Sequence, residues 1–149
     1  MKNLKFDLRD YSKTDYDFVY EAKKLGYKDY VEMFYGKWND VQQHEMFEAY
    51  INERENYITI IEVNGKNAGF IDVSESGDFL EIGNICLIPE FRGRGIGSTF
   101  FQSILEERPN QNMKLRVFKT NPAKKLYERF GFKVTSETQT HLYMERKKG

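Results

Sequence analysis

Two hydrophobic periods divide the chain. In the first 55 residues, apolar side chains recur at helical spacing after a short alternating stretch. Gly26 is expected to end the first helix, and Asn39 or Asp40 to cap the third, whose apolar stripe comprises Val41, Met46, Phe47, Tyr50 and Ile51. The pattern therefore predicts a strand at residues 4–9 and helices at 15–25, 30–35 and 41–51.

From residue 57 onward the period changes to that of strands. Asn64-Gly65 is typical of a two-residue hairpin turn, and Gly131 of a helix C-terminus. The predicted strands lie at 57–63, 68–73, 79–88, 114–118, 132–136 and 141–145, with helices at 97–107 and 122–130. This order predicts a mixed α+β sheet, in one domain spanning residues 1–149.

Composition narrows the classes of partner. The 23 basic and 23 acidic residues balance, so no long-range field favours nucleic acid or an anionic membrane. No signal peptide or membrane span is recognisable, and a soluble cytoplasmic protein is expected. Cys86 is the only cysteine, which excludes an internal disulfide and a cysteine-based zinc site, and no metal is expected.

A glycine- and arginine-rich turn at residues 92–98 carries the clearest chemistry. It follows the buried strand 79–88 and opens a helix, so its amides and the helix dipole favour a phosphate or pyrophosphate. A dinucleotide fingerprint would need an acidic residue after a second parallel strand, and a Walker loop would need Gly-Lys-Ser/Thr; neither is present. A turn without a ligand would not explain three glycines together with two arginines.

The hexamer Arg92-Gly93-Arg94-Gly95-Ile96-Gly97, preceded by Ile-Pro-Glu-Phe and followed by the segment Asn121–Phe132, resembles the signature of the GNAT superfamily of acyl-CoA-dependent N-acetyltransferases. The resemblance is to small bacterial single-domain members. It implies a twisted, mostly antiparallel sheet of about six or seven strands with about four or five flanking helices. The fourth and fifth strands are expected to splay and hold acyl-CoA between them.

The resemblance also implies acetyl-CoA as cofactor. Its pyrophosphate would bind the amides of the turn, and its pantetheine arm would lie like an extra strand against strand 79–88. A backbone N–H near Leu87 would stabilise the developing oxyanion, and a β-bulge is expected to aim it. Asn121 would contact the cofactor or cap the next helix. The implied contacts are Ile85, Cys86, Leu87, Arg92, Gly93, Arg94, Gly95, Ile96, Gly97, Ser98 and Asn121.

Two residues are the catalytic candidates. Tyr127 matches a family tyrosine that protonates the leaving thiolate, although it also suits packing of its helix on the sheet. Glu81 matches a family general base that acts through water, although an exposed strand carboxylate paired with a lysine or arginine would look the same. A second branch, the ribosomal-protein N-terminal acetyltransferases, places its glutamate where this chain has Arg116, which cannot act as a base.

The acceptor is the least determined part. The resemblance makes Tyr35, Trp38 and His141 candidates to border its site, with core packing as the alternative for the aromatic residues. Aromatic residues and acids in the first 50 positions suit a cationic amine, but composition does not choose among small molecules and peptides.

The predicted activity is transfer of an acetyl group from acetyl-CoA to a primary amine of a small molecule or peptide, by direct attack in a ternary complex. The alternative is a non-catalytic acyl-CoA sensor of the same fold. A homodimer through an exposed last strand at 141–145 is also possible.

Overall fold

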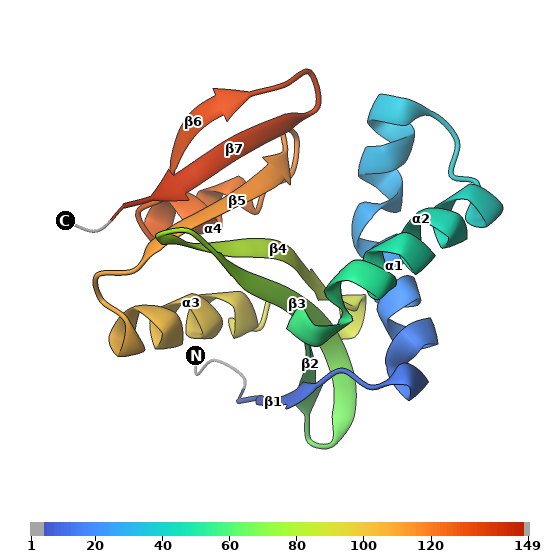
Figure 1. Ribbon diagram of the computed structural model, residues 1–149, viewed down its shortest axis with the longest axis horizontal. Coiled ribbons are helices and arrows are strands. Elements are labelled where there is room, and N and C mark those ends of the chain that lie inside the picture. Colours follow the sequence, from blue (N-terminus) through green and yellow to red (C-terminus); the bar gives the residue numbers. More distant parts are fainter. Residues whose placement is uncertain (1–4, 148–149) are drawn as a thin grey trace.

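The computed structural model describes residues 5–147, and a seven-stranded sheet in the order β1-β2-β3-β4-β5-β7-β6 forms its centre (Figure 1). All neighbouring strands are antiparallel except β4 and β5, which are parallel. Leu4, at the start of the predicted first strand, lies outside the described residues. The strands are β1 Asp7–Asp10, β2 Ile58–Val63, β3 Lys66–Ser76, β4 Phe79–Leu87, β5 Asn112–Phe118, β6 Lys133–Glu137 and β7 His141–Arg146.

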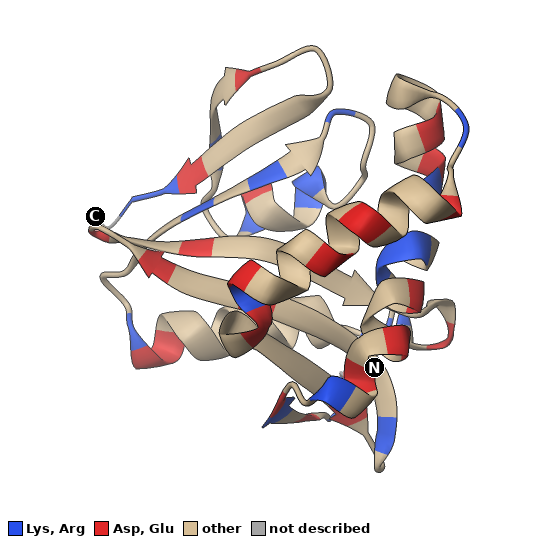
Figure 2. Cartoon of the chain, turned by 45° about the vertical axis from the view of Figure 1, so that its right-hand side comes forward, with Lys and Arg blue, Asp and Glu red and all other residues tan. Residues whose placement is uncertain are grey.

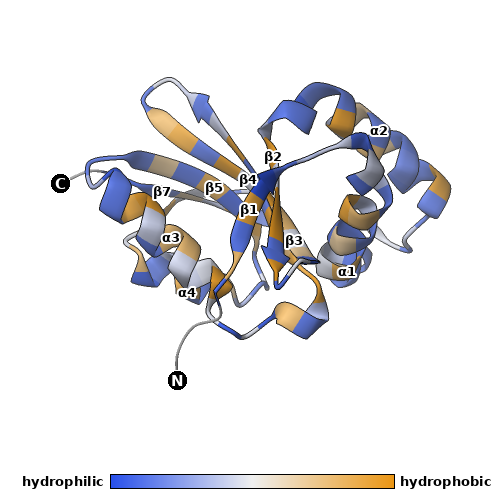
Figure 3. Cartoon of the chain, turned by 90° about the horizontal axis from the view of Figure 1, so that it is seen from below, coloured by the Kyte–Doolittle hydropathy of each residue, from blue (hydrophilic) through white to orange (hydrophobic). Residues whose placement is uncertain are grey.

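Four α-helices cover the two faces of the sheet. They are α1 Tyr16–Tyr35, α2 Asp40–Arg54, α3 Ile96–Glu107 and α4 Lys124–Arg129. Figure 3 shows α1 and α2 on one side of the strands and α3 and α4 on the other. The predicted mixed α+β sheet is therefore confirmed. Within residues 5–147, no helix is long and apolar enough to cross a membrane.

A separate apolar core fills each side of the sheet. On the α3/α4 side, Phe100, Phe101 and Phe132 pack on the inward residues of β3, β4, β5 and β7. On the α1/α2 side, Val19, Phe47 and other helical residues pack on β2, β3 and β4. Successive strand residues point to opposite faces, so the position of a residue along a strand decides which core, and which set of functional groups, it joins.

The predicted break at Gly26 is wrong, because α1 continues through it to Tyr35 as one helix. A Cβ atom at this position would lie 3.5 Å from the Cys86 Sγ, so the glycine lies where α1 passes closely over β4. Beyond it, Tyr30 and Phe34 stack on Phe118 of β5 and support the second half of the helix. The glycine therefore serves packing and does not cap the helix.

The N-cap of α2 is Asn39, whose side chain accepts a hydrogen bond from the Gln42 amide at 3.0 Å. The predicted stripe is only partly right. Phe47 and Ile51 are buried, but Val41 and Met46 are 72% and 59% exposed. At 3.6 residues per turn both point well away from the Phe47–Ile51 face, which is the one that packs on α1 and the sheet.

The expected exposed last strand is also corrected. β7 lies between β5 and β6 and pairs with both, so the free edges of the sheet are β1 and β6. The reason is that the β6–β7 hairpin folds back with β6 on the outside. All five residues of β6 are exposed, and any pairing through this end of the sheet would use β6.

Candidate active site

The strands β4 and β5 separate in the middle of the sheet. They pair only from Phe79 to Ile82 on β4 and from Asn112 to Leu115 on β5. At the same level the register with β3 shifts between Asp72 and Val73, which leaves Gly83 as an extra residue in β4. A Cβ atom on Gly83 would lie 1.9 Å from the Asp72 Oδ1, so this bulge requires glycine. The predicted splay and bulge are both present.

Beyond the bulge, β4 has one unpaired edge. The Ile88 amide donates to the Ala68 carbonyl of β3 at 2.9 Å. Because backbone groups of alternate residues point to opposite edges of a strand, the amides of Ile85 and Leu87 point away from β3. They face the place where β5 has separated, which is called the strand divergence below.

The turn after β4 presents a run of unused amides. Gly93 and Gly95 have φ angles of 72° and 81°, which favour glycine, and α3 begins at Ile96. Among the described residues, the amides from Gly93 to Ser98 donate to no backbone carbonyl, whereas the Arg92 amide donates to the Pro89 carbonyl at 3.2 Å. The run of free donors therefore comprises residues 93–98.

The two arginines of the turn have different roles. The Arg92 Nε donates to the Leu87 carbonyl at 2.8 Å and its Nη2 to the Leu25 carbonyl at 3.1 Å. Arg92 thus ties the end of β4 to α1. The Arg94 guanidinium lies 5.9 Å from the centre of the Phe91 ring, and it adds positive charge beside the free amides.

Tyr127 lies on α4 with its ring packed edge-on against Phe101 and Phe132. Burial, together with the neighbouring Cys86, raises the pKa of its phenol to about 12. Burial likewise raises the pKa of the Cys86 thiol to about 12. Both groups are neutral at neutral pH, and within residues 5–147 no hydrogen bond engages the Tyr127 hydroxyl, so it can donate to a ligand.

Glu81 lies on β4 just before the bulge, and its side chain is 44% exposed. Its Oε2 lies 3.7 Å from the Nζ of Lys114, the residue opposite it on β5. The side chain faces the α1/α2 side of the sheet, because its neighbours Leu80 and Ile82 belong to the opposite core. The carboxylate is accessible to water, and it is also one partner of a surface ion pair.

His141, Tyr35 and Thr140 connect α1 to the β6–β7 turn. The Tyr35 hydroxyl lies 3.1 Å from the Thr140 Oγ1, which lies 2.8 Å from the His141 Nδ1. The imidazole packs on Phe118 at 4.2 Å, and burial and the charge of Arg116 lower its pKa. Trp38 lies elsewhere: it is buried between α1 and α2, and its Nε1 donates to Asp40 at 2.9 Å.

Asn121 lies in the turn before α4, where its Oδ1 accepts a hydrogen bond from the Ala123 amide at 2.9 Å. This bond closes a turn two residues before α4, whose N-cap is Ala123 and has no side-chain cap.

A buried polar network beside the divergence was not anticipated from the sequence. Asp72 is 1% exposed and accepts hydrogen bonds from the Tyr50 hydroxyl, the Asn84 amide at 2.6 Å and the Arg54 guanidinium at 3.4 Å. The signal was one aspartate inside the apolar run Gly69–Val73. A carboxylate in such a strand needs several donors, and here they come from α2 and β4.

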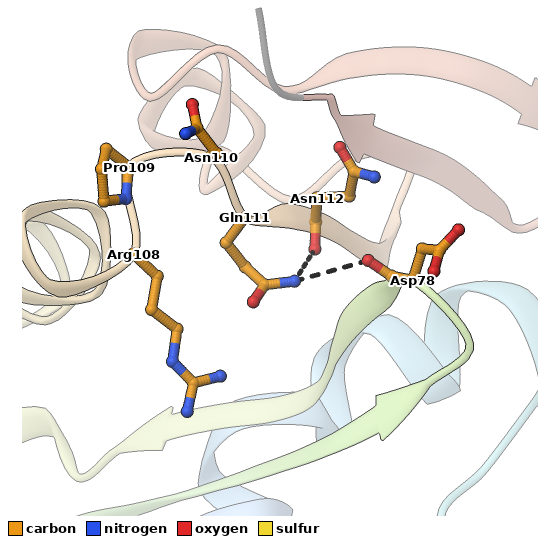
Figure 4. A pocket seen from close by; sticks show the side chains of 6 residues that line it. All are labelled: Asp78, Arg108, Pro109, Asn110, Gln111 and Asn112. Carbon is orange, nitrogen blue, oxygen red and sulfur yellow. Dashed lines mark hydrogen bonds between the residues drawn. The ribbon is translucent and has the colours of Figure 1, made fainter.

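A separate hollow of about 520 Å³ lies at the other end of β4 and β5, beyond their paired segment. Figure 4 shows its lining, with the Gln111 side chain bridging the backbone of Asn112 and Asp78. It is open and polar, and it contains neither free turn amides nor the candidate catalytic side chains. It is therefore not part of the site at the divergence.

The free edge of β4 and the run of free amides at the start of α3 are groups that suit an extended ligand with a phosphate. The family model of the acetyltransferase (GNAT) domain matches residues 15–143 of the sequence, and the chain belongs to this family. The resemblance seen in residues 92–97 and 121–132 is thereby confirmed.

Individual relatives and solved structures similar to this chain are also N-acetyltransferases. A putative [ribosomal protein bS18]-alanine N-acetyltransferase of Bacillus subtilis is 33% identical over 129 residues, covering 83% of this chain and 78% of that protein. The structure of the ribosomal-protein-S18-alanine N-acetyltransferase from Escherichia coli has a TM-score of 0.69 at 17% identity and covers 97% of this chain and 95% of its own. The PaiA N-acetyltransferase from Thermoplasma acidophilum, in complex with coenzyme A, has a TM-score of 0.69 at 19% identity and covers 97% and 99%.

The chain is thus an N-acetyltransferase that uses acetyl-CoA. Its residues fit the cofactor: the free amides of 93–98 suit a pyrophosphate, and the β4 edge at Ile85 and Leu87 offers backbone hydrogen bonds to an extended amide-containing arm.

Proposed function

We propose that the protein acetylates a primary amine of a small molecule or peptide by direct attack in a ternary complex. The proposal is supported chiefly by the free backbone donors at the divergence. The unengaged Tyr127 phenol on α4 and the solvent-accessible Glu81 carboxylate just before the bulge add the two proton carriers that the reaction needs. Holding the two reactants together would supply much of the rate.

Each group has one role in this proposal. Acetyl-CoA supplies the activated acetyl thioester. The Leu87 amide donates to the carbonyl oxygen as negative charge develops on it. Tyr127 donates its proton to the leaving sulfur, which its neutral phenol can do throughout the neutral range. Glu81 takes the proton from the attacking amine through a water molecule.

The names of the relatives indicate which acceptors to test first. The name of the Bacillus relative specifies an alanine of a ribosomal protein, so a peptide N-terminal amine is one acceptor class to test. Arg116 argues against assigning the same substrate to this chain. It is a cation, and it stands where that branch of the family has its glutamate. Small-molecule amines therefore belong in the same panel.

The test is a turnover assay with purified protein, acetyl-CoA and a panel of peptide and small-molecule amines. Release of free CoA thiol and the mass of the product are measured together. Amine-dependent thiol release with a product one acetyl group heavier supports the proposal. Accumulation of an acetyl group on the protein before amine is added, followed by its transfer, would show a two-step mechanism and contradict direct attack.

A further inference from the structure

Lys23 is a half-buried cation without a carboxylate partner. It lies on α1, and its Nζ is 4.6 Å from the centre of the Tyr50 ring. Among the described residues, no carboxylate oxygen lies within 4.0 Å of it, whereas its neighbour Lys24 pairs with Asp40 at 3.0 Å. Burial lowers the pKa of Lys23, Cys86 and Asp72 act in the opposite direction, and the charge of Arg116 lowers it. An ammonium group in this position loses part of its hydration, and no carboxylate within 4.0 Å replaces those lost interactions.

Arg116 is the second cation at this place. On β5, Leu115 and Val117 point into the α3/α4 core, so Arg116 points to the α1/α2 side, as Phe118 does when it stacks on Tyr30. It lies on the part of β5 that no longer pairs with β4. Its side chain is exposed and has no ion pair among residues 5–147. Arg116 is the first residue of β5 beyond its last pair with β4, Ile82–Leu115. Two residues beyond the same pair on β4 lies Asn84, which donates at 3.3 Å to the hydroxyl of Tyr50, the residue whose ring lies under the Lys23 Nζ.

The anions in this neighbourhood are already used. Asp72 has the three donors described above, including the Arg54 guanidinium at 3.4 Å. Glu81 faces Lys114 at 3.7 Å. Cys86 is neutral because burial raises the pKa of its thiol to about 12. Asp72 also attracts Lys23, but the four cations Lys23, Arg54, Lys114 and Arg116 face only two carboxylates here, Asp72 and Glu81, so positive charge is in excess.

The acids that suggested a cationic acceptor lie elsewhere. Asp15 binds the Arg9 guanidinium at 2.8 Å, and Asp40 receives the Tyr20 hydroxyl and the Trp38 indole as well as Lys24. Figure 2 shows acidic residues along α2 and basic segments on β5. Asp15 and Asp40 are therefore occupied by partners within the first 40 residues.

We propose that the acceptor amine carries a carboxylate, which binds between Lys23 and Arg116. This inference rests on the proposed acetyl transfer to an amine at the divergence and adds the class of acceptor. A carboxylate there would neutralise both cations and accept charge-assisted hydrogen bonds from each. The amine of the same molecule would then lie on the Glu81 side of the sheet, where the proposed base is.

The kinetic experiment compares acceptors that differ by one charge. Alanine is matched with alaninamide, which lacks the carboxylate, and the amidated peptide Ala-Asp-Ala with amidated Ala-Asn-Ala, which separates free amino acids from acidic peptides. The carboxylate member of at least one pair is expected to have the higher kcat/KM. Since a charged hydrogen bond contributes about 1.5–3 kcal/mol, Lys23→Met and Arg116→Gln should each reduce that preference roughly tenfold or more. Arg116→Glu should invert it.

The control is Lys133→Met on the exposed edge strand β6, which removes the same charge and should leave the preference unchanged. Circular dichroism of every variant shows whether it is folded. Equal kcat/KM within both acceptor pairs, or a preference that survives both Lys23→Met and Arg116→Gln, overturns the inference.

A binding measurement separates this inference from the proposed function. Calorimetry with CoA present compares N-acetylaspartate with N-acetylasparaginamide, which has no carboxylate, and needs no turnover. Tighter binding of N-acetylaspartate that is lost in Lys23→Met and Arg116→Gln supports the carboxylate site, even if no amine in the panel is acetylated. Equal binding, or no binding, of the two compounds to the wild-type protein contradicts it.

Discussion

The two sides of the strand divergence present different chemical groups. The side toward α3 uses main-chain groups: the amides of 93–98, which glycines with positive φ make available. The side toward α1 and α2 uses side chains such as Lys23, Tyr50 and Arg116, which come from elements far apart in the sequence.

This difference separates what is common to the family from what is particular to this chain. Backbone donors recognise groups that every acyl-CoA shares, and they tolerate changes of side chain as long as the turn keeps its shape. Side-chain charges recognise one acceptor and reject others, because an unmatched buried charge is costly. Changes on the first side should therefore affect cofactor binding, and changes on the second should affect the choice of amine.

The largest effect is expected at Tyr127, where both sides meet. Tyr127→Phe removes the proposed proton donor but keeps the ring that packs on Phe101, so kcat should fall by about 10²-fold or more with little change in the KM for acetyl-CoA. Tyr16→Phe, a tyrosine whose hydroxyl donates to Glu48 near the start of α1, should leave kcat unchanged. Steady-state kinetics at several pH values measures both, and an unchanged kcat in Tyr127→Phe removes the assignment.

A change of about 10²-fold in kcat is expected for Glu81→Gln, because the amide cannot accept the amine proton. The matched control is Glu75→Gln on β3, whose carboxylate lies 3.8 Å from Arg108 at the surface. If Glu81 contributes only its ion pair with Lys114, both variants will have wild-type kcat, and the acid limb of the pH–rate profile will be the same in both.

A smaller effect, confined to the cofactor side, is expected for Gly95→Ala. Its φ of 81° is unfavourable for alanine by about 1–2 kcal/mol, and relief of this strain would deform the turn, so the Kd for acetyl-CoA should rise roughly tenfold. Gly77→Ala has a similar conflict, at φ 61° in the β3–β4 turn. It should reduce the stability but not the affinity, as measured by calorimetry; an equal loss of affinity in the two would assign the effect to general destabilisation.

The smallest effect is on stability and concerns His141. Burial and Arg116 lower the pKa of this imidazole below 6.5, so the unfolded chain binds the proton more tightly than the folded chain does. The resulting stability is complete above pH 6.5 and is lost as the pH falls from there through the folded pKa. His141→Gln should flatten this part of the curve in urea unfolding between pH 7.5 and 5. An identical slope in the variant would show that other groups cause it.

The sequence was most informative where local chemistry decides the structure. The Asn64-Gly65 turn, the Asn39 cap and the strand–turn–helix around 92–98 depend on nearest neighbours, and all three were predicted. Predictions from the sequence were wrong where tertiary packing decides the structure. Gly26 gave the signal of a helix end, but it lies inside α1 because Cys86 of β4 approaches it.

The same distinction applies to the candidate site. Glycine spacing indicated the cofactor side, whereas the network around Asp72 requires residues of α2, β3 and β4 to meet. The hydrophobic periodicity of the sequence does not indicate that these residues come together. Lys23 and Arg116 are a similar case, since they lie far apart in the sequence and only the packing of α1 on the sheet puts both on the same side of it.

Hydrogen–deuterium exchange with and without CoA tests most directly whether the two sides are divided in this way. The account predicts slower exchange for the amides of residues 93–98 and for Ile85 and Leu87 when CoA is bound, with α2 and the β6–β7 hairpin unchanged until an acceptor or product is added. Unchanged exchange at residues 93–98 in the presence of saturating CoA would contradict it.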